Sequence, residues 1–299
     1  MNRIRLFFAV AFAIAVFGGG IISSPAFGID FFPPVTGFED DDLDWFKNNV
    51  GGTTLDVGDQ LQGVVKFNQT FGVFGGGPST SAELTGVFDL TVTAKTLNDS
   101  NGNGIFEPLL GETWNYTFGA TGAGGLLAGR TAGTLLTLWL DETSPDLVIV
   151  PPNCVSLADC VAKASDGTVF LDLGLAGDVN TSWKANNVAS DDPAIVGALP
   201  GSTKLGTFDT FLNILFNGTG QIFSPQVCFP LCTAGADNSV LWIGSGDIIG
   251  GQGLTNGSFA RSDSDFQLRS AAVPEPASLL LLGAGLIGLN FISRRRTKK

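Results

Sequence analysis

Histidine is absent from this sequence of 299 residues. The absence excludes Ser-His-Asp and Cys-His triads, histidine general bases and His-ligated zinc. Carboxylate-pair hydrolases need only Asp and Glu, but the adjacent acids Asp141-Glu142 and Asp191-Asp192 cannot flank one bond, because neighbouring strand residues point to opposite faces. Nucleophile-elbow, phosphate-loop and metalloprotease-helix motifs are also missing. We therefore predict that the protein is not an enzyme.

Charged residues are few, at 15% of the sequence against about 25% in a typical soluble protein. Part of the shortfall lies at the N-terminus, where Arg3 and Arg5 precede an apolar run and small residues follow up to Gly28. This order is typical of a secretory signal peptide. We predict a signal peptide at residues 1–28 that engages the general secretion machinery; a retained N-terminal membrane helix is the alternative.

The C-terminus has three parts. These are the segment Val273, Pro274, Glu275 and Pro276, an uncharged apolar run at residues 277–292, and a basic tail at residues 293–299 with Arg294, Arg295 and Arg296. A helix over the apolar run would cover about 24 Å, which is short for a bilayer core of about 30 Å but workable if the flanking residues snorkel. The cations keep the tail in the cytoplasm and place the upstream chain across the membrane. The prolines hold the glutamate on an extended segment that a protease could read.

This arrangement resembles the PEP-CTERM sorting signal of Gram-negative bacteria, which exosortase, a membrane-embedded cysteine transpeptidase, recognises. The resemblance covers only residues 273–299. It implies a precursor that is anchored in the inner membrane through a transient span, is processed by exosortase, and then reaches the cell-envelope surface or the extracellular matrix. It also implies a link to exopolysaccharide production, biofilm and floc formation. An ordinary single-span tail anchor is the alternative.

Between the two ends, apolar and polar residues alternate in short segments, with no helical stripe of useful length. Clear examples are residues 88–94, 136–141, 169–175 and 208–217. Period-two patterning, broken by Gly, Asn, Asp and Ser clusters, indicates half-buried antiparallel strands. We predict an all-β protein: a single antiparallel β-sandwich domain at residues 29–272, flanked by the N-terminal signal peptide and the C-terminal transmembrane sorting helix.

The body of the chain is strongly acidic. Residues 29–276 contain nine cations and 28 acids, which gives a net charge near −19. Such a charge repels phosphate backbones, so we expect no nucleic-acid partner. Anionic exopolysaccharide, bridged by divalent cations, is a more natural partner. The densest acidic run, from Glu39 to Asp44, is predicted to be a solvated loop, with a cation-binding cluster as the alternative.

One loop has the spacing of a calcium site. Its oxygen-bearing residues are Asp99, Asn101 and Asn103, followed by the carbonyl of Ile105 and by Glu107. This resembles the first half of an EF-hand loop, with Gly104 at the sharp turn. The bidentate glutamate expected at position 12 is missing, so Glu112 or a distant carboxylate would close the site. We predict weak calcium binding; an Asx- and Gly-rich turn without metal is the alternative.

The four cysteines form two close pairs, Cys154/Cys160 and Cys228/Cys232. An even number in an exported chain indicates disulfides. We favour pairing within each pair, because each lies in a Pro-containing loop that can bend back on itself. Pairing between the loops, free thiols and zinc are alternatives, although the spacing suits zinc poorly.

Aromatic residues offer a second kind of site. Trp114, Tyr116 and Phe118 recur at every second residue, so they share one face of a strand, either as a sugar-stacking platform or as core. Trp139 lies on the more polar face of its strand and is the better candidate for an exposed ring. These residues support the alternative function, a carbohydrate-binding module or a glycan-active hydrolase, beside the predicted non-enzymatic surface or matrix protein.

Overall fold

The computed structural model describes residues 36–72, 82–227 and 239–269. The predicted signal peptide, Cys228 and Cys232, and the sorting segment with its helix at residues 277–292 all lie outside these ranges. Within the described ranges, no helix has both the length and the apolar character needed to cross a membrane.

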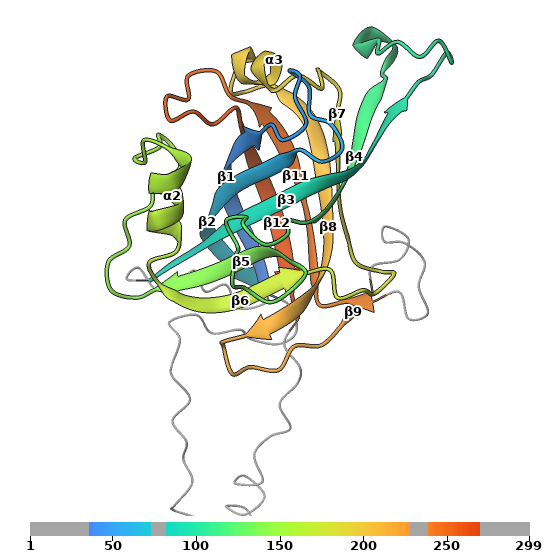
Figure 1. The fold of residues 1–299 in the computed structure, drawn as a ribbon. Helices are drawn as coiled ribbons and strands as arrows, with labels where there is room; N and C mark the ends of the chain where they lie inside the picture. Colours follow the sequence, from blue (N-terminus) through green and yellow to red (C-terminus); the bar gives the residue numbers. More distant parts are fainter. Residues whose placement is uncertain (1–35, 73–81, 228–238, 270–299) are drawn as a thin grey trace, which may run out of the picture.

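The described chain consists mainly of strands (Figure 1). They are β1 (Thr36–Lys47), β2 (Gln60–Gly72), β3 (Glu83–Asn98), β4 (Thr113–Ala120), β5 (Thr134–Asp141), β6 (Thr168–Gly174), β7 (Ser182–Asn187), β8 (Lys204–Asn217), β9 (Gln226–Val227), β10 (Ser239–Val240), β11 (Trp242–Gly250) and β12 (Ala260–Leu268). The helical elements are η1 (Pro108–Leu110), α2 (Leu157–Ala164) and α3 (Pro193–Ala198). The all-β prediction is confirmed.

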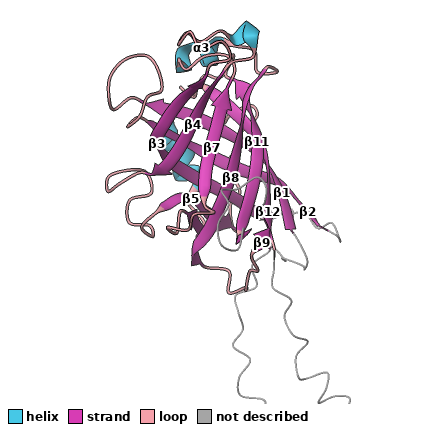
Figure 2. Cartoon of the chain, turned by 90° about the vertical axis from the view of Figure 1, so that its right-hand side faces the viewer, coloured by secondary structure: helices cyan, strands magenta, loops and turns pink. Residues whose placement is uncertain are grey.

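Ten of the strands form one closed antiparallel sheet, and β9 and β10 form a separate pair, so the prediction of a two-sheet sandwich was wrong. The order runs β11-β12-β1-β2-β3-β4-β7-β8, and β8 pairs with β11 to complete an eight-stranded barrel (Figure 2). Along one edge, the long strands β3 and β8 each pair with two partners in succession. Strand β3 pairs with β4 and then β5, and β8 pairs with β7 and then β6. Closure leaves the ring without a free edge, which an open sandwich would have to protect.

Glycine and aromatic residues face each other inside this barrel. Three inward glycines stand directly opposite aromatic residues on the neighbouring strand: Gly63 opposite Phe88, Gly244 opposite Phe266 and Gly246 opposite Phe208. A Cβ on Gly63 would lie 2.1 Å from Cζ of Phe88, so that ring needs the space that glycine leaves. The high glycine content is thus partly a packing requirement of the aromatic core.

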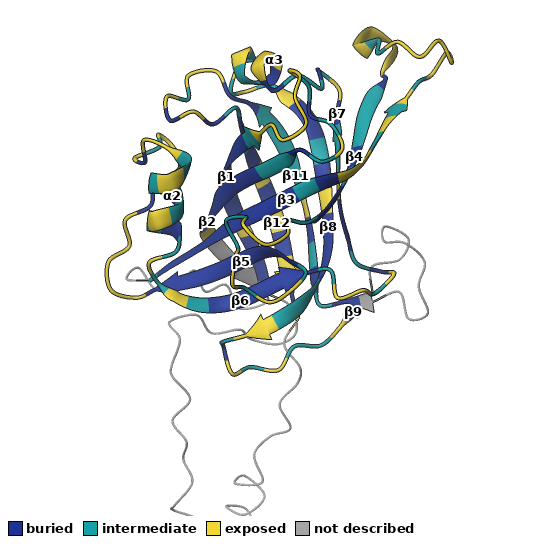
Figure 3. Ribbon diagram, in the orientation of Figure 1, coloured by how far each residue is buried: buried dark blue, intermediate teal, exposed yellow. Residues whose placement is uncertain are grey.

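A second apolar layer covers one outer side of the barrel. Helix α2 lies over β2 and β3 (Figure 3). It closes an apolar cluster that includes Leu43, Val64 and Trp139. The hydroxyl of Ser156 caps the helix by accepting a hydrogen bond from the backbone N–H of Asp159 (3.3 Å). A disulfide joins Cys154 to Cys160, with the two Cα atoms 5.0 Å apart. Local pairing is confirmed for this pair.

The start of the first barrel strand, β1, lies beside the end of the last one, β12. Thr36, the first residue of β1, pairs with Leu268, the last of β12. The opposite end of the barrel carries α3 and the β3–β4 hairpin, which projects beyond the barrel (Figures 1 and 2). The hairpin tip is largely exposed (Figure 3).

Candidate functional site

The acidic run forms strand β1, not the solvated loop predicted from the sequence. It pairs with β12 on one side and β2 on the other, so its backbone is built into the barrel wall. Side chains alternate in a strand, and Asp40, Asp42 and Asp44 therefore point into the barrel while Glu39 and Asp41 point outward. The three inward carboxyls are only 1%, 5% and 4% exposed, respectively.

Strand β12 supplies hydrogen bonds to two of these carboxyls. Oδ1 of Asp40 accepts from the backbone N–H of Ser264 (3.1 Å) and from its hydroxyl. Oδ2 of Asp44 accepts from the hydroxyl of Ser262 (2.9 Å). Oδ2 of Asp40 and Oδ1 of Asp42 are buried and accept no hydrogen bond from these two serines. The Asp40 and Asp42 carboxyls instead hydrogen-bond to each other when one of them is protonated.

Burial raises the pKa values of these three carboxyls, so they do not all ionise at the same pH. Desolvation raises the pKa of Asp40 to about 7 and that of Asp44 to about 6. Hydrogen bonds with Asp42 and Ser264 counteract the rise at Asp40, and the bond from Ser262 counteracts it at Asp44. Desolvation also raises the pKa of Asp42 well above its usual range, and the charges of Asp40 and Asp44 on either side of it raise it further. The three groups therefore share protons near neutral pH.

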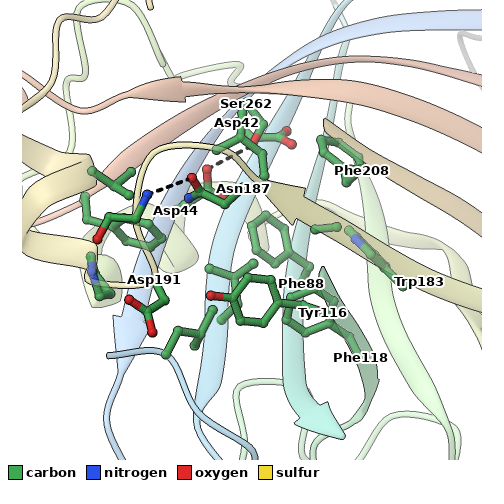
Figure 4. A pocket seen from close by; sticks show the side chains of 18 residues that line it. Asp42, Asp44, Phe88, Tyr116, Phe118, Trp183, Asn187, Asp191, Phe208 and Ser262 are labelled. Carbon is green, nitrogen blue, oxygen red and sulfur yellow. Dashed lines mark hydrogen bonds between the residues drawn. The ribbon is translucent and has the colours of Figure 1, made fainter. Parts of the chain in front are cut away.

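Asp42 and Asp44 line a cavity of about 60 Å³ (Figure 4). Helix α3 contributes Pro193 and Val196 to its lining. The backbone N–H of Leu55 donates to the carbonyl of Asp191 (2.8 Å) and ties together two loops beside the cavity.

Aromatic rings form much of the cavity wall. They are Phe88, Tyr116, Phe118, Trp183 and Phe208. Trp183 stacks on Phe208 with ring centres 6.1 Å apart, and its ring centre is 6.0 Å from that of Phe88. None of the described residues that line the cavity is a lysine or an arginine. The site therefore combines buried carboxyls with aromatic faces.

The aromatic residues singled out in the sequence do not form a common surface. Tyr116 and Phe118 face the barrel interior and line the cavity. Trp114 is half-buried, and Nζ of Lys95 lies 4.6 Å from the centre of its ring. Trp139 is only 9% exposed, because the layer under α2 covers its ring. The expectation that Trp139 is an exposed stacking ring was therefore wrong.

The calcium-like loop lies at the tip of the β3–β4 hairpin. The carboxylate of Asp99 accepts from the backbone N–H groups of Asn101 (3.1 Å), Gly102 (2.6 Å) and Gly104 (2.6 Å). These bonds lower the pKa of Asp99, with the bond from Gly104 the largest cause. The loop is thus organised around a carboxylate in the first ligand position.

The remaining predicted ligands bond to the loop itself. The side-chain amides of Asn101 and Asn103 donate to Glu107 (2.5 and 2.8 Å). Glu112 is fully buried and accepts from the backbone N–H groups of Ser100 (3.0 Å) and Glu107 (2.7 Å). Across the described part of the chain, no three Asp, Glu, Cys or His side chains are placed to hold a metal ion. Calcium binding here, with the carbonyl of Ile105 as a further ligand, stays a prediction.

A second acidic region lies on the outer face of β8, β11 and β12. Asp209, Asp247, Asp263 and Asp265 line an open hollow of about 400 Å³. Asp263 stands between Asp247 and Asp41 on the neighbouring strands. Partial burial raises the pKa of Asp263, and repulsion from Asp41, Asp265 and Asp247 adds to the effect.

Together, the fold and these sites define a closed antiparallel barrel with carboxyls inside and an acidic outer wall. Residues 272–296 match the family model described as the PEP-CTERM protein-sorting motif, so the chain carries a PEP-CTERM sorting segment, as the sequence predicted. The motif implies an exported, membrane-anchored precursor with exosortase as its processing partner. No curated protein and no solved structure matches the chain.

Proposed function

We propose that this chain is a non-enzymatic protein of the cell surface or extracellular matrix of a Gram-negative bacterium, released from its anchor by exosortase. Its barrel would contribute to exopolysaccharide, biofilm or floc formation by binding anionic polymer through divalent cations. The sorting motif at residues 272–296 is the observation that carries the proposal.

The acidic outer wall supports the part of the proposal that concerns polymer. Asp41, Asp263 and Asp247 occupy directly opposite positions on three neighbouring strands, and like charges placed in this way destabilise a sheet. Lys204 neutralises Asp247, with its Nζ 2.5 Å from Oδ1 of that residue, and the charge of Arg261 offsets part of the repulsion at Asp263. A divalent cation would relieve the remaining repulsion and could at the same time bind a carboxylate of a polysaccharide.

The size of the cavity supports a non-enzymatic role. Its volume of about 60 Å³ is small beside the roughly 300–1,000 Å³ of typical ligand pockets. One observation favours a glycan-active hydrolase instead: Asp42 and Asp44 are two residues apart on one strand face, so their Cα atoms lie roughly 7 Å apart, near the carboxyl separation of inverting glycosidases. A sugar could reach them only if the barrel end beneath α3 opened.

Processing predicts a defined mass for the mature protein. We expect material from normal cells to end near Pro276, and Glu275→Ala to retain the arginine tail, because the altered motif is no longer recognised. Intact-mass spectrometry of surface material, with and without exosortase, measures this. Gln267→Ala, on the outward face of β12, is the matched control and should be processed normally. Arginine tails on the protein from normal cells would contradict the proposal.

Calcium is expected to raise the melting temperature. With a dissociation constant of about 1 mM, calcium at about 10 mM would add about 1.4 kcal/mol of stability, or roughly 3–5 °C. Differential scanning calorimetry against sodium chloride of equal ionic strength measures the shift. Asp99→Asn should remove the contribution of the hairpin loop, and Asp263→Asn with Asp265→Asn that of the outer wall. An unchanged melting temperature in the wild type would remove calcium from the proposal.

A further inference from the structure

We propose that the end of the barrel opposite α3 docks on the surface of a phospholipid bilayer, the one in which the precursor is anchored. The docking face consists of Phe216, near the end of β8, of Ile222, in the loop of residues 218–225 that leads to β9, and of Arg269. This inference goes beyond the proposed function, because it concerns how the barrel sits before exosortase releases it.

The docking face presents two large apolar side chains to solvent. Ile222 is 71% exposed and Phe216 is 43% exposed. The loop that carries Ile222 lies at the end of the barrel opposite α3 (Figures 1 and 2). None of residues 218–225 is charged, whereas four aspartates line the outer wall of β8, β11 and β12. An uncharged loop with an exposed apolar side chain suits the interface of a bilayer.

Hydrogen bonds within the loop hold it in shape. Oδ1 of Asn217 accepts from the backbone N–H (3.0 Å) and the hydroxyl (2.7 Å) of Thr219. Nδ2 of Asn217 donates to the carbonyl of Gln221 (2.7 Å), and the backbone N–H of Gln221 donates to the hydroxyl of Thr219 (3.0 Å). Ile222 therefore follows a pre-organised turn, and docking would order little additional chain.

The course of the chain identifies the bilayer as the partner. The backbone N–H of Ser224 donates to the carbonyl of Arg269 (2.7 Å), so the loop contacts the last residue that the structure describes. Nε2 of Gln226 donates to the carbonyl of Gln267 (3.1 Å) and ties the end of the loop to β12 as well. Eight residues lead from Arg269 to residue 277, where the predicted span begins, and they reach at most about 28 Å.

The charge of the docking face fits the same partner. Arg269 is exposed, and a cation close to the membrane is attracted to anionic headgroups. The other strongly exposed apolar side chain on a projecting loop is Leu109, at the tip of the β3–β4 hairpin. That loop carries Asp99 and Glu107, which an anionic surface would repel, and it lies at the opposite end of the barrel. Leu109 thus provides a control within the same chain.

The experiment measures which end of the barrel touches lipid. A photoreactive benzoylphenylalanine replaces either Ile222 or Leu109 in the full-length chain. Each protein is reconstituted into vesicles of phosphatidylethanolamine and phosphatidylglycerol at about 3:1, which supply the anionic surface. Flotation establishes that the chain is anchored, and mass spectrometry after illumination counts lipid adducts. We expect about tenfold more adducts at position 222 than at position 109, because only the docking face enters the interface.

A longer tether separates docking from mere proximity. Inserting about 20 Gly and Ser residues after Arg269 adds a flexible segment with an average span of about 25 Å. A barrel that docks should keep several-fold more adducts at position 222 than at position 109 in this variant. Phe216→Ser in the lengthened chain should lower the adducts at position 222 about threefold, since it removes one apolar contact. Val50→Ser changes an exposed apolar residue in the β1–β2 loop, and it should have no effect.

Three results would overturn the proposal for a chain that floats with the vesicles. They are equal adducts at positions 222 and 109, loss of the difference in the lengthened chain, and unchanged adducts in the Phe216→Ser variant. A chain that does not float would lack the anchor that the docking requires, which overturns it as well. Failure of calcium or polysaccharide binding would instead contradict the proposed function and leave the lipid adducts unchanged.

Discussion

Raising the pH from about 5 to about 8 is expected to destabilise the barrel by about 4 kcal/mol, through Asp40 and Asp44 together. Both carboxyls have pKa values in the folded barrel, about 7 and about 6, that lie above their ordinary value of 3.8. In this pH range the folded state therefore holds more protons than the unfolded chain. The stabilisation is complete below the ordinary pKa and is lost as the pH rises through the folded values.

Urea unfolding at constant ionic strength measures this slope. Asp42→Asn should increase the stability at about pH 8 and flatten the profile, because the amide removes a buried carboxyl whose own pKa is raised by desolvation and by the charges of Asp40 and Asp44. Asp41→Asn changes a neighbouring carboxyl that points outward, and it should leave most of the slope in place. A free energy of unfolding that is constant or increases over this range would contradict the assignment of Asp40 and Asp44 as buried, protonated groups.

Arg130→Met is expected to cost about 3 kcal/mol, because it leaves the carboxylate of Asp172 buried without its counter-charge. Asp172 is 1% exposed, and Nε and Nη2 of Arg130 donate to its two oxygens at 3.0 and 3.1 Å. The hydroxyls of Thr131 and Thr137 complete its shell at 2.9 and 2.8 Å. The effect should fall near the lower end of the range for buried pairs, since a quarter of the Arg130 side chain is exposed.

Urea unfolding also measures this loss, and the double variant Arg130→Met/Asp172→Asn should recover part of it, because the neutral amide no longer needs a cation. Lys204→Met is the matched control at a surface pair. Its partner Asp247 and the lysine itself are about half-exposed, so this change should cost less than about 1 kcal/mol. Equal losses at the two pairs would show that burial does not govern the effect.

Several strands could be predicted from the sequence, but strand β1 and the closure of the sheet could not. The alternating segments at residues 88–94, 136–141 and 208–217 lie within β3, β5 and β8, because a strand with one buried face needs that pattern. Closure depends on the pairing of β8 with β11, and on the fact that β3 and β8 each pair with two successive strands along one edge. These pairings join residues that are far apart in the sequence. That Gly63 leaves space for the ring of Phe88 can be recognised only when the register of β2 and β3 is known.

The candidate site was missed because it reverses the usual strand pattern. In β1 the inward positions carry Asp40, Asp42 and Asp44, whereas Leu43 and Trp45 face outward under the second apolar layer. A pattern of this kind looks like a solvated loop when the burial of each face is unknown. The same outer layer explains the error at Trp139, whose strand face would be exposed if α2 did not cover it.

The short stretch of chain after Leu268, at the end of β12, limits how far the sorting motif can lie from the barrel. Four residues separate Leu268 from Val273, so even a fully extended chain holds the start of the sorting motif within roughly 18 Å of the barrel. A membrane span at residues 277–292, as the sequence predicts, would hold this end of the barrel close to the bilayer, with little clearance for the processing enzyme. A molecule arriving from the medium would first meet the far rim, where Leu109 is 99% exposed on the projecting hairpin.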